Sequence, residues 1–248
     1  MMCGDSVSSR VMYHGVACDV EVVAVILDTK ISARKMIKRR IKKLGFTKVL
    51  GQIAFFLFNK ILFKLTKDRI KELFVSFELN NSPIPNHLMF SVDSVNSKES
   101  IKLLQTLQPE AVVVNGTRII SGEVLSSIKA PFINTHVGIT PNYRGVHGGY
   151  WALVEGKPEH CGVTVHLVDQ GIDTGAVLYQ DIIYPGRRDN FNTYPVHQMA
   201  KAIPLMRLAL RDVLMNQIQP QKYHDASKLW SHPTLFEYLK NRIYEGVR

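Results

Sequence analysis

Short apolar runs alternate with segments of helical spacing along the first half of the chain. Val20 to Leu27 is nearly all apolar and β-branched, as expected of a strand buried on both faces. Ala111 to Val114 and Ala130 to Thr135 predict two more buried strands. Ahead of the predicted strand at Ala111 to Val114, Ser97 can cap a helix that runs through Ile101 to Leu107. This alternation predicts an α/β fold with a mainly parallel sheet.

The second half of the chain predicts an antiparallel pair followed by helices. Gly162 to Val168 alternates in polarity and continues into a loop at Asp169 to Gly175. Ala176 to Tyr184 then indicates an antiparallel return strand. Helices are expected at about Pro195 to Met215 and at His232 to Tyr244.

The start of the chain leaves little room for a first strand. If Val20 to Leu27 is the second strand and Ser6 to Ala17 the helix before it, only Met1 to Cys3 remain for the first. The pattern therefore predicts a first strand that is truncated. With 248 residues the chain can bury a full core and carry a small appendage. We expect one domain over residues 1–218 and a C-terminal helical extension over residues 219–248.

A cationic segment follows the predicted second strand. The formal net charge is +10, and Lys30 to Lys43 contains eight Lys and Arg residues and no Asp or Glu. Ile37, Ile41 and Leu44 recur at helical spacing, which predicts an amphipathic helix with a basic outer face. Four interpretations remain open: a solvated surface helix, or attraction of an anionic substrate, nucleic acid or a negatively charged membrane surface.

Bulky apolar residues follow the basic segment. They run from Ile53 to Leu65 and are interrupted by polar residues, so the segment is too short to span a bilayer. We expect its helix to pack on the sheet, with a membrane interface as the alternative, so peripheral membrane contact through Lys30 to Leu65 stays open. The chain has no uninterrupted run of 18 apolar residues, and its first 15 residues lack an apolar signal core. A cytoplasmic location is therefore expected.

Cysteine and histidine spacing indicates neither a disulfide framework nor a metal centre. Cys3, Cys18 and Cys161 are odd in number and form no CxxC pair. The nine His residues show no HExxH or related ligand spacing. We expect reduced thiols and no metal.

Asn134, His136 and Asp173 combine an amide, an imidazole and a carboxylate beside glycine-rich backbone. Acyl transfer to an amine needs a donor for the developing oxyanion and a group that handles the amine proton. Asn can donate to the oxyanion, His can do so or relay a proton, and Asp can hold that His or position a proton-carrying water. Ligands of open α/β sheets bind outside the carboxyl ends of strands, where these residues are expected. Alternatively, Asn134 and His136 cap a strand end and Asp173 is a turn residue.

A longer string of residues around this trio resembles the folate-dependent formyltransferases. This family includes methionyl-tRNA formyltransferase, glycinamide ribonucleotide formyltransferase and the sugar N-formyltransferases. The matching elements, in order, are Asn134-x-His136, Pro141 to Gly145, Trp151 to Leu153, Gly162 to His166 and Asp173 to Gly175. The resemblance implies a Rossmann-like catalytic domain, 10-formyltetrahydrofolate as formyl donor, and Asn134, His136 and Asp173 as the catalytic set.

The resemblance also implies where the donor binds. In the family, the loop after the strand at 111–114 holds the pterin ring through backbone hydrogen bonds, and a flat donor and acceptor edge suits such backbone groups. The implied cofactor-binding residues are Asn115, Gly116, Thr117, Arg118, Ile119, Ile120, Val168 and Asp169. Taken alone, Arg118 would be a surface charge.

The acceptor implied by the resemblance is a primary amine. Single-domain size favours an anionic small molecule, a nucleotide-linked amino sugar, over nucleic acid. Residues 138–141 read Gly-Ile-Thr-Pro where the tRNA and glycinamide enzymes usually show Ser-Leu-Leu-Pro, and the start lacks the family's Gly-rich phosphate loop, which argues against a purine-pathway role. The alternatives are a formyltetrahydrofolate hydrolase, a formyltransferase for tRNA or another amine, and a non-enzymatic basic module that binds nucleic acid or membrane.

Overall fold

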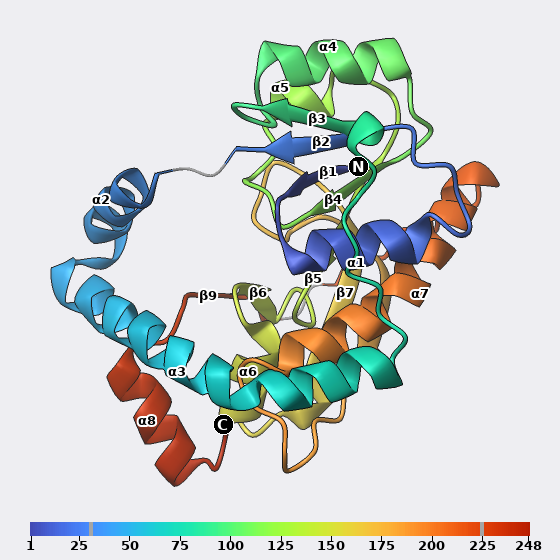
Figure 1. The fold of residues 1–248 in the computed structure, drawn as a ribbon. Helices are drawn as coiled ribbons and strands as arrows, with labels where there is room; N and C mark the ends of the chain where they lie inside the picture. Colours follow the sequence, from blue (N-terminus) through green and yellow to red (C-terminus); the bar gives the residue numbers. More distant parts are fainter. Residues whose placement is uncertain (30–31, 224–225) are drawn as a thin grey trace.

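One sheet organises the molecule (Figure 1). In the computed structural model, which describes residues 1–29, 32–223 and 226–248, seven strands lie in the order β3-β2-β1-β4-β5-β7-β8. Their bounds are β1 (Met2–Gly4), β2 (Val25–Asp28), β3 (Met89–Val92), β4 (Val112–Asn115), β5 (Phe132–His136), β7 (Gly162–Leu167) and β8 (Val177–Ile182). β1 to β5 run parallel, whereas β7 and β8 are antiparallel to their neighbours. The predicted α/β class with a mainly parallel sheet and an antiparallel return is confirmed.

The first strand occupies the predicted central place. β1 pairs with β2 on one side and with β4 on the other. The second strand, however, begins at Val25 and not at Val20. The reason is pairing: Met1 already bonds Ala24 and Ile26 at the start of the ladder, so β1 offers residues 20–23 no partner. The sequence also missed β3, whose side chains are mostly exposed.

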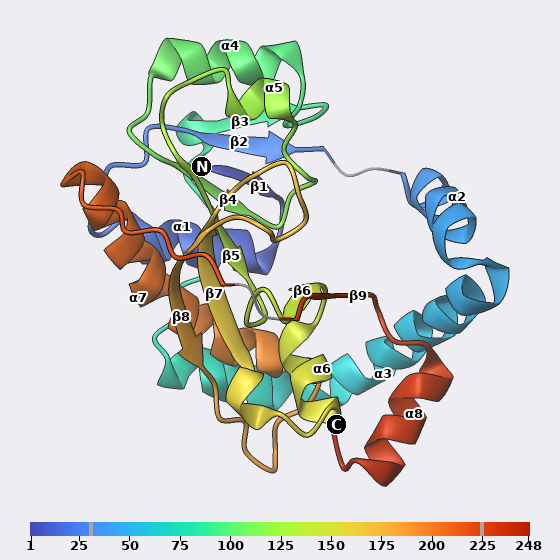
Figure 2. The same cartoon turned by 180° about the vertical axis from the view of Figure 1, so that it is seen from behind.

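Helices cover both faces of the sheet. The helices α1 (Val7–Val16) and α7 (Tyr194–Leu214) pack on one face, and α4 (Lys98–Leu107) and α5 (Gly122–Leu125) pack on the other (Figures 1 and 2). Successive side chains of β4 point to opposite faces of the sheet. Val112 and Val114 therefore pack in the cluster with α4, whereas Val113 packs in the cluster with α7. Ser6 and Ser97 cap α1 and α4, so these two predicted helix starts are confirmed.

Two helices are inserted between β2 and β3. The basic segment forms α2 (Ala33–Leu44), although Lys30 at its start lies outside the described residues. After a turn at Gly45, α3 (Phe46–Ser76) runs beneath the sheet and packs on α7 and on α8 (Leu235–Tyr244) (Figure 1). The expectation that the apolar helix packs on the sheet was therefore wrong, because other helices supply its partners.

The length of α3 also corrects the sequence analysis. It is one continuous helix of 31 residues, since the polar residues within it do not break helical hydrogen bonding. An 18-residue window of α3 has a mean hydropathy of 1.4 and is 22% buried, so by length and composition alone it could cross a membrane.

A second, small sheet joins the C-terminal segment to the domain. β6 (Tyr143–Gly145) pairs in parallel with β9 (Lys228–Trp230), and α6 (Gly148–Val154) follows β6. Tyr238 of α8 lies at 0% exposure in a cluster with Phe55 of α3 and Tyr150 of α6. Short 3₁₀ helices at Asn86–Leu88 and Pro158–His160 complete the described elements.

Candidate active site

Asn134, His136 and Asp173 come together at the carboxyl edge of the sheet. Asn134 and His136 lie two residues apart on β5, so both project from the same face of the strand. His136 is the last residue of β5, whereas the sequence placed it just past the strand. Asp173 arrives from the loop between β7 and β8. The sheet therefore brings together side chains that are 39 positions apart in the sequence.

The carboxylate of Asp173 links His136 to the backbone of β6. Its Oδ2 lies 3.3 Å from Nδ1 of His136. The same oxygen accepts a hydrogen bond of 2.9 Å from the amide of Gly145. Both side chains are largely buried, at 4% and 14% exposure. This contact orients the imidazole ring from one side.

The other side of the His136 ring is also held by an acceptor. Its Nε2 donates to the carbonyl oxygen of Tyr143 at 2.6 Å. A neutral imidazole has one N–H and can donate to only one of these acceptors, whereas the doubly protonated ring donates to both. Two acceptors therefore hold the His136 ring, one at each nitrogen.

His166 belongs to the same cluster, and the sequence analysis did not include it in the catalytic set. In the antiparallel pair of β5 and β7, His166 lies directly opposite Asn134. Its Nε2 lies 3.2 Å from the amide nitrogen of Asn134 and 3.8 Å from Oδ1 of Asp173. The signal that could have found it is the Gly162 to His166 motif, but the strand register was needed to pair it with Asn134.

The hydrogen bonds of His166 define its tautomer. Its Nδ1 lies 2.7 Å from the carbonyl oxygen of Leu167, so Nδ1 is the donor and Nε2 accepts from Asn134. Burial lowers the pKa of His166, and the neighbouring His136 contributes to the lowering, although the Leu167 carbonyl and Asp173 oppose it. A neutral His166 thus positions the Asn134 amide.

Close backbone approaches shape the loops around these residues. A Cβ at Gly138 would lie 2.9 Å from Nε2 of His136 and 2.6 Å from the Tyr143 carbonyl oxygen. A Cβ at Gly175 would lie 1.7 Å from the Leu167 carbonyl oxygen. Neither position can hold a side chain without moving the site, which gives a steric reason for Gly175 of the sequence motif and for Gly138 of the altered loop.

The loop implied to bind the cofactor is held in place by Asp28 at the end of β2. Oδ2 of Asp28 accepts from the Thr117 hydroxyl at 2.9 Å and from Nε of Arg118 at 2.8 Å. The Asn115 amide donates to the hydroxyls of Ser8 and Ser9 in α1. The side chains of Asn115, Thr117 and Arg118 are thus used within the protein, and Asn115 belongs to β4 and not to the loop.

The two predicted cofactor segments adjoin each other. The side chain of Val168 packs with the cluster that contains buried Ile120. A Cβ at Gly122 would lie 2.6 Å from the Gln170 side chain. Asp169 accepts from the Gly171 amide and the Thr174 hydroxyl, which orders the loop that leads to Asp173. Ile119 remains exposed at the loop surface.

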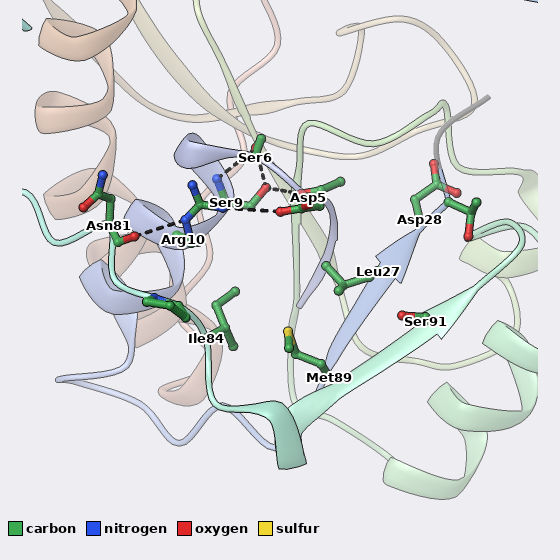
Figure 3. Close-up of a pocket in the computed structure, with 13 residues that line it drawn as sticks. Asp5, Ser6, Ser9, Arg10, Leu27, Asp28, Asn81, Ile84, Met89 and Ser91 are labelled. Carbon is green, nitrogen blue, oxygen red and sulfur yellow. Dashed lines mark hydrogen bonds and ion pairs between the residues drawn. The ribbon is translucent and has the colours of Figure 1, made fainter. Parts of the chain in front are cut away.

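A cavity of about 640 Å³ lies along the same edge of the sheet, beside β1 and β2 (Figure 3). Ser6, Ser9 and Arg10 at the start of α1 line one end together with Asn81, and Asp28 and Ser91 lie at the other end. Arg10 donates to the Asn81 carbonyl at 3.1 Å. Asp28 lines the cavity and also holds the 115–120 loop, so the cavity and this loop share a residue.

Comparison with known sequences identifies relatives of this part of the chain. A family model described as formyl transferase matches residues 18–191. The methionyl-tRNA formyltransferase of Thermodesulfovibrio yellowstonii is 40% identical over 94 residues, which is 38% of this chain and 30% of that protein. The methionyl-tRNA formyltransferase of a Cyanothece species is 34% identical over 109 residues, 44% of this chain and 32% of that protein. The matches thus span about a third of each relative.

Solved structures share the fold at low sequence identity. A 4-N formyltransferase from Francisella tularensis superposes with a TM-score of 0.57 at 15% identity, over 93% of this chain and 74% of that one. Phosphoribosylglycinamide formyltransferase from Streptococcus pneumoniae gives a TM-score of 0.54 at 19% identity, over 86% and 97%. An N-formyltransferase from Helicobacter canadensis, solved with folinic acid and dTDP-3-aminofucose, gives a TM-score of 0.56 at 16% identity, over 93% and 69%.

Proposed function

Because this chain belongs to the formyl transferase family, we propose that it moves a formyl group from 10-formyltetrahydrofolate to a primary amine, with Asn134, His136 and Asp173 as the catalytic residues. One observation carries the proposal: the Asp173 carboxylate lies 3.3 Å from His136, and Asn134 projects from the same face of β5. An amide donor, an imidazole and a carboxylate are the groups that formyl transfer requires.

The hydrogen bonds suggest a role for each group. In the reaction the amine nitrogen attacks the formyl carbon, the carbonyl oxygen gains negative charge, and the bond from this carbon to the donor nitrogen breaks. An Asn amide has two N–H groups, so Asn134 can donate one to His166 and the other to the oxyanion. His136 can accept the proton that the amine loses when the neutral ring carries its N–H on Nδ1, toward Asp173; its Nε2 then faces substrate in place of the Tyr143 carbonyl and passes the proton to the departing donor nitrogen. Asp173 then stabilises the charged ring.

The 115–120 loop is the proposed contact for the donor. Asp28 fixes this loop through Thr117 and Arg118, so its backbone groups are preorganised to meet a flat ring edge. Folate should slow amide hydrogen exchange in residues 115–120 and in residues 168–173. Protection confined to α2 would place the donor elsewhere.

For the acceptor we propose a nucleotide-linked amino sugar in the cavity of Figure 3. The amino end of α1 offers positive charge there, which suits a phosphate group, and Arg10, paired with Asp5 at 3.3 Å, can contribute by exchanging that partner. The Helicobacter canadensis N-formyltransferase with the same fold was solved with a nucleotide-linked amino sugar, dTDP-3-aminofucose.

A tRNA-borne amine is the second candidate, and sequence similarity favours it. The methionyl-tRNA formyltransferase of Thermodesulfovibrio yellowstonii is 40% identical over the matched 94 residues.

Product analysis separates these acceptors. The protein is incubated with 10-formyltetrahydrofolate and, separately, with nucleotide-linked amino sugars, aminoacylated initiator tRNA, or buffer alone. Mass spectrometry should show a formylated amino sugar that fails to form with the Asn134→Ala variant. Formylated aminoacyl-tRNA as the main product would show that the acceptor is tRNA-borne and not a sugar, while the proposed formyl transfer would stand. Formate as the main product in every reaction would mean hydrolysis and would overturn formyl transfer.

A further inference from the structure

Positive charge is concentrated in the helices inserted between β2 and β3. Residues 29–67 hold twelve Lys and Arg residues and no Asp or Glu, whereas the rest of the chain has nineteen cations against twenty-one acids. Within α2, none of the seven cations pairs with a carboxylate in the described ranges 1–29, 32–223 and 226–248. The inserted helices therefore carry more than the whole net charge of +10, and much of it is free to meet an external anion.

The outer side of α3 is apolar next to this charge. Its first half exposes large apolar side chains at spacings of three and four residues, which place them on one stripe: Phe46, Leu50, Ile53, Leu57 and Ile61. Four of them are more than half exposed, at 64% for Phe46, 55% for Leu50, 57% for Leu57 and 61% for Ile61. Scattered surface hydrophobics are ordinary, but a continuous stripe of this kind marks an interaction surface.

The stripe changes character along the same helix. Where the helical spacing continues into the second half of α3, the corresponding positions are Lys64, Asp68 and Lys71. All three are exposed and polar, as a solvated helix face should be. The continuous apolar stripe thus ends at Ile61, in the half of α3 that follows α2 (Figures 1 and 2), and Val75 is a single exposed apolar residue further along the same face.

The C-terminal helix α8 also exposes apolar side chains. It packs against α3 through Tyr238, which contacts Phe55. Its outer residues Phe236, Ile243 and Tyr244 are each at least 75% exposed. We call the α3 stripe together with the outer side chains of α8 the apolar surface; its members are Phe46, Leu50, Ile53, Leu57, Ile61, Phe236, Ile243 and Tyr244.

The inner side of α3 holds the helix on the folded domain along its length. Near its start, the Gln52 amide donates to the His232 carbonyl at 2.7 Å. In its middle, Asn59 and Asn192 exchange side-chain hydrogen bonds, and further along Arg69 pairs with buried Asp189 at 3.0 Å. A helix that crossed a bilayer would lose these contacts, so α3 can lie on a membrane surface while the domain stays folded, but it cannot span it.

We propose that the apolar surface docks on an anionic lipid bilayer, with α3 and α8 in the interface and the α2 cations on lipid phosphates. An apolar helix face flanked by lysine and arginine is the pattern of interfacial helices, which bind by apolar burial together with attraction to anionic lipids. Nucleic acid would use the cations of α2 but would gain little from eight exposed aliphatic and aromatic side chains. A second copy of the chain would bring a second cationic helix against the first, which is unfavourable.

The test is sedimentation of the full-length protein with vesicles of phosphatidylcholine alone or with about one third phosphatidylglycerol. Binding should require the anionic lipid and weaken as salt rises, because exposed charges are screened over about 8 Å at physiological ionic strength. The double variant Leu50→Gln with Leu57→Gln should bind these vesicles about tenfold or more weakly. The matched control is Leu214→Gln with Met215→Gln, two exposed apolar residues at the end of α7, and it should bind like the parent.

Three results would overturn the proposal, with circular dichroism showing that each variant is folded. The first is parent-like vesicle binding by the Leu50→Gln, Leu57→Gln variant, which would reduce the interaction to charge alone. The second is a dimer, seen by light scattering, that this variant dissociates while no vesicle binding occurs. The third is binding to duplex RNA without binding to vesicles. The assay contains no folate and no acceptor, so its outcome is independent of the proposed enzyme activity.

Discussion

At the scale of single residues, hydrogen-bond complementarity decides what the site can do. His136 lies between two acceptors, the Asp173 carboxylate and the Tyr143 carbonyl. Asn134 lies against His166, whose Nε2 accepts from its amide. Each polar group therefore has a partner that fixes its orientation, and each can be removed by one conservative substitution.

We expect Asn134→Ala and Asp173→Asn each to lower turnover by about 10² to 10³, because the first removes an oxyanion donor and the second removes the charge that stabilises His136. The measurement is kcat at saturating donor and acceptor, with circular dichroism as a check on folding. Asp181→Asn is the matched control, since this carboxylate pairs with Lys201 at the surface. Turnover within a few-fold of the parent for either site variant would exclude that residue from the chemistry.

A second pair of histidines predicts how stability depends on pH. Nε2 of His147 lies 2.9 Å from Nδ1 of His232. Burial lowers the pKa of His147 to about 3, and burial together with nearby Arg40 lowers that of His232 to about 4. An unfolded His titrates near 6.5. The stability from keeping both rings neutral is thus fully present above about pH 6.5 and is lost as the pH falls toward the folded values.

The free energy of unfolding should therefore fall by up to about 1.4 kcal/mol per pH unit for each of these two histidines on acidification below about pH 6.5. Urea unfolding at a series of pH values measures this slope. His232→Gln removes one titrating group and should make the slope shallower. A free energy of unfolding that stays constant or rises between about pH 6.5 and 5 would contradict the pair's role.

At the scale of elements, the small β6–β9 sheet connects the C-terminal segment to the loop that carries Asp173. Gly145 lies in β6 with a φ of 95°, and a Cβ there would lie 2.4 Å from the Trp230 carbonyl oxygen of β9. The amide of Gly145 also donates to Asp173. The adjacent Arg144 donates to the Ile172 carbonyl at 3.0 Å. Strand pairing and the position of Asp173 thus depend on one glycine.

Gly145→Ala should destabilise the protein by about 2 kcal/mol more than Gly156→Ala and should also lower turnover. Gly156 is the matched control, because its φ is 67° but a Cβ there would meet nothing within 4 Å. Alanine at position 156 would adopt the same unfavourable positive φ but would not clash with any neighbouring atom. Denaturant unfolding and steady-state kinetics measure the two effects. Equal destabilisation by both substitutions would show that β6–β9 pairing adds little.

At the scale of the whole molecule, three distant parts of the chain share one core. Tyr238 of α8 is fully buried against Phe55 of α3 and Tyr150 and Phe191 of the domain. The division into residues 1–218 and 219–248 remains a prediction, but this packing makes α3 and α8 dependent on each other. Loss of the α8 contacts should therefore lower the local stability of α3 and α6.

We expect Tyr238→Ala to lower the free energy of unfolding by about 3–5 kcal/mol, since it removes a buried aromatic ring from a filled cluster. Hydrogen exchange should then speed up in α3 and α6 as well as in α8. Tyr244→Ala on the same helix is the control, because Tyr244 is 75% exposed and its loss should change stability little. Faster exchange confined to α8 would show that the extension folds separately.

The sequence alone determined the class of fold, the helix start near Ser6, the helix cap at Ser97, and the family. These depend on local information, because apolar spacing and capping residues act within one or two turns of chain. The motif around Asn134, His136 and Asp173 can likewise be recognised from the amino-acid sequence. The sequence analysis named these three residues, and the sheet places Asp173 beside His136.

Only the tertiary structure decided which residues surround that motif. His166 meets Asn134 through strand register, and Gly145 meets Asp173 through the loop around β6, neither of which is encoded in spacing. The extent of α3 and the exposure of its apolar stripe also depend on which partners the fold supplies. The physical reason is the same throughout: the free energy of a contact between distant segments depends on the whole chain's packing, whereas the free energy of a helical turn is set by its own residues.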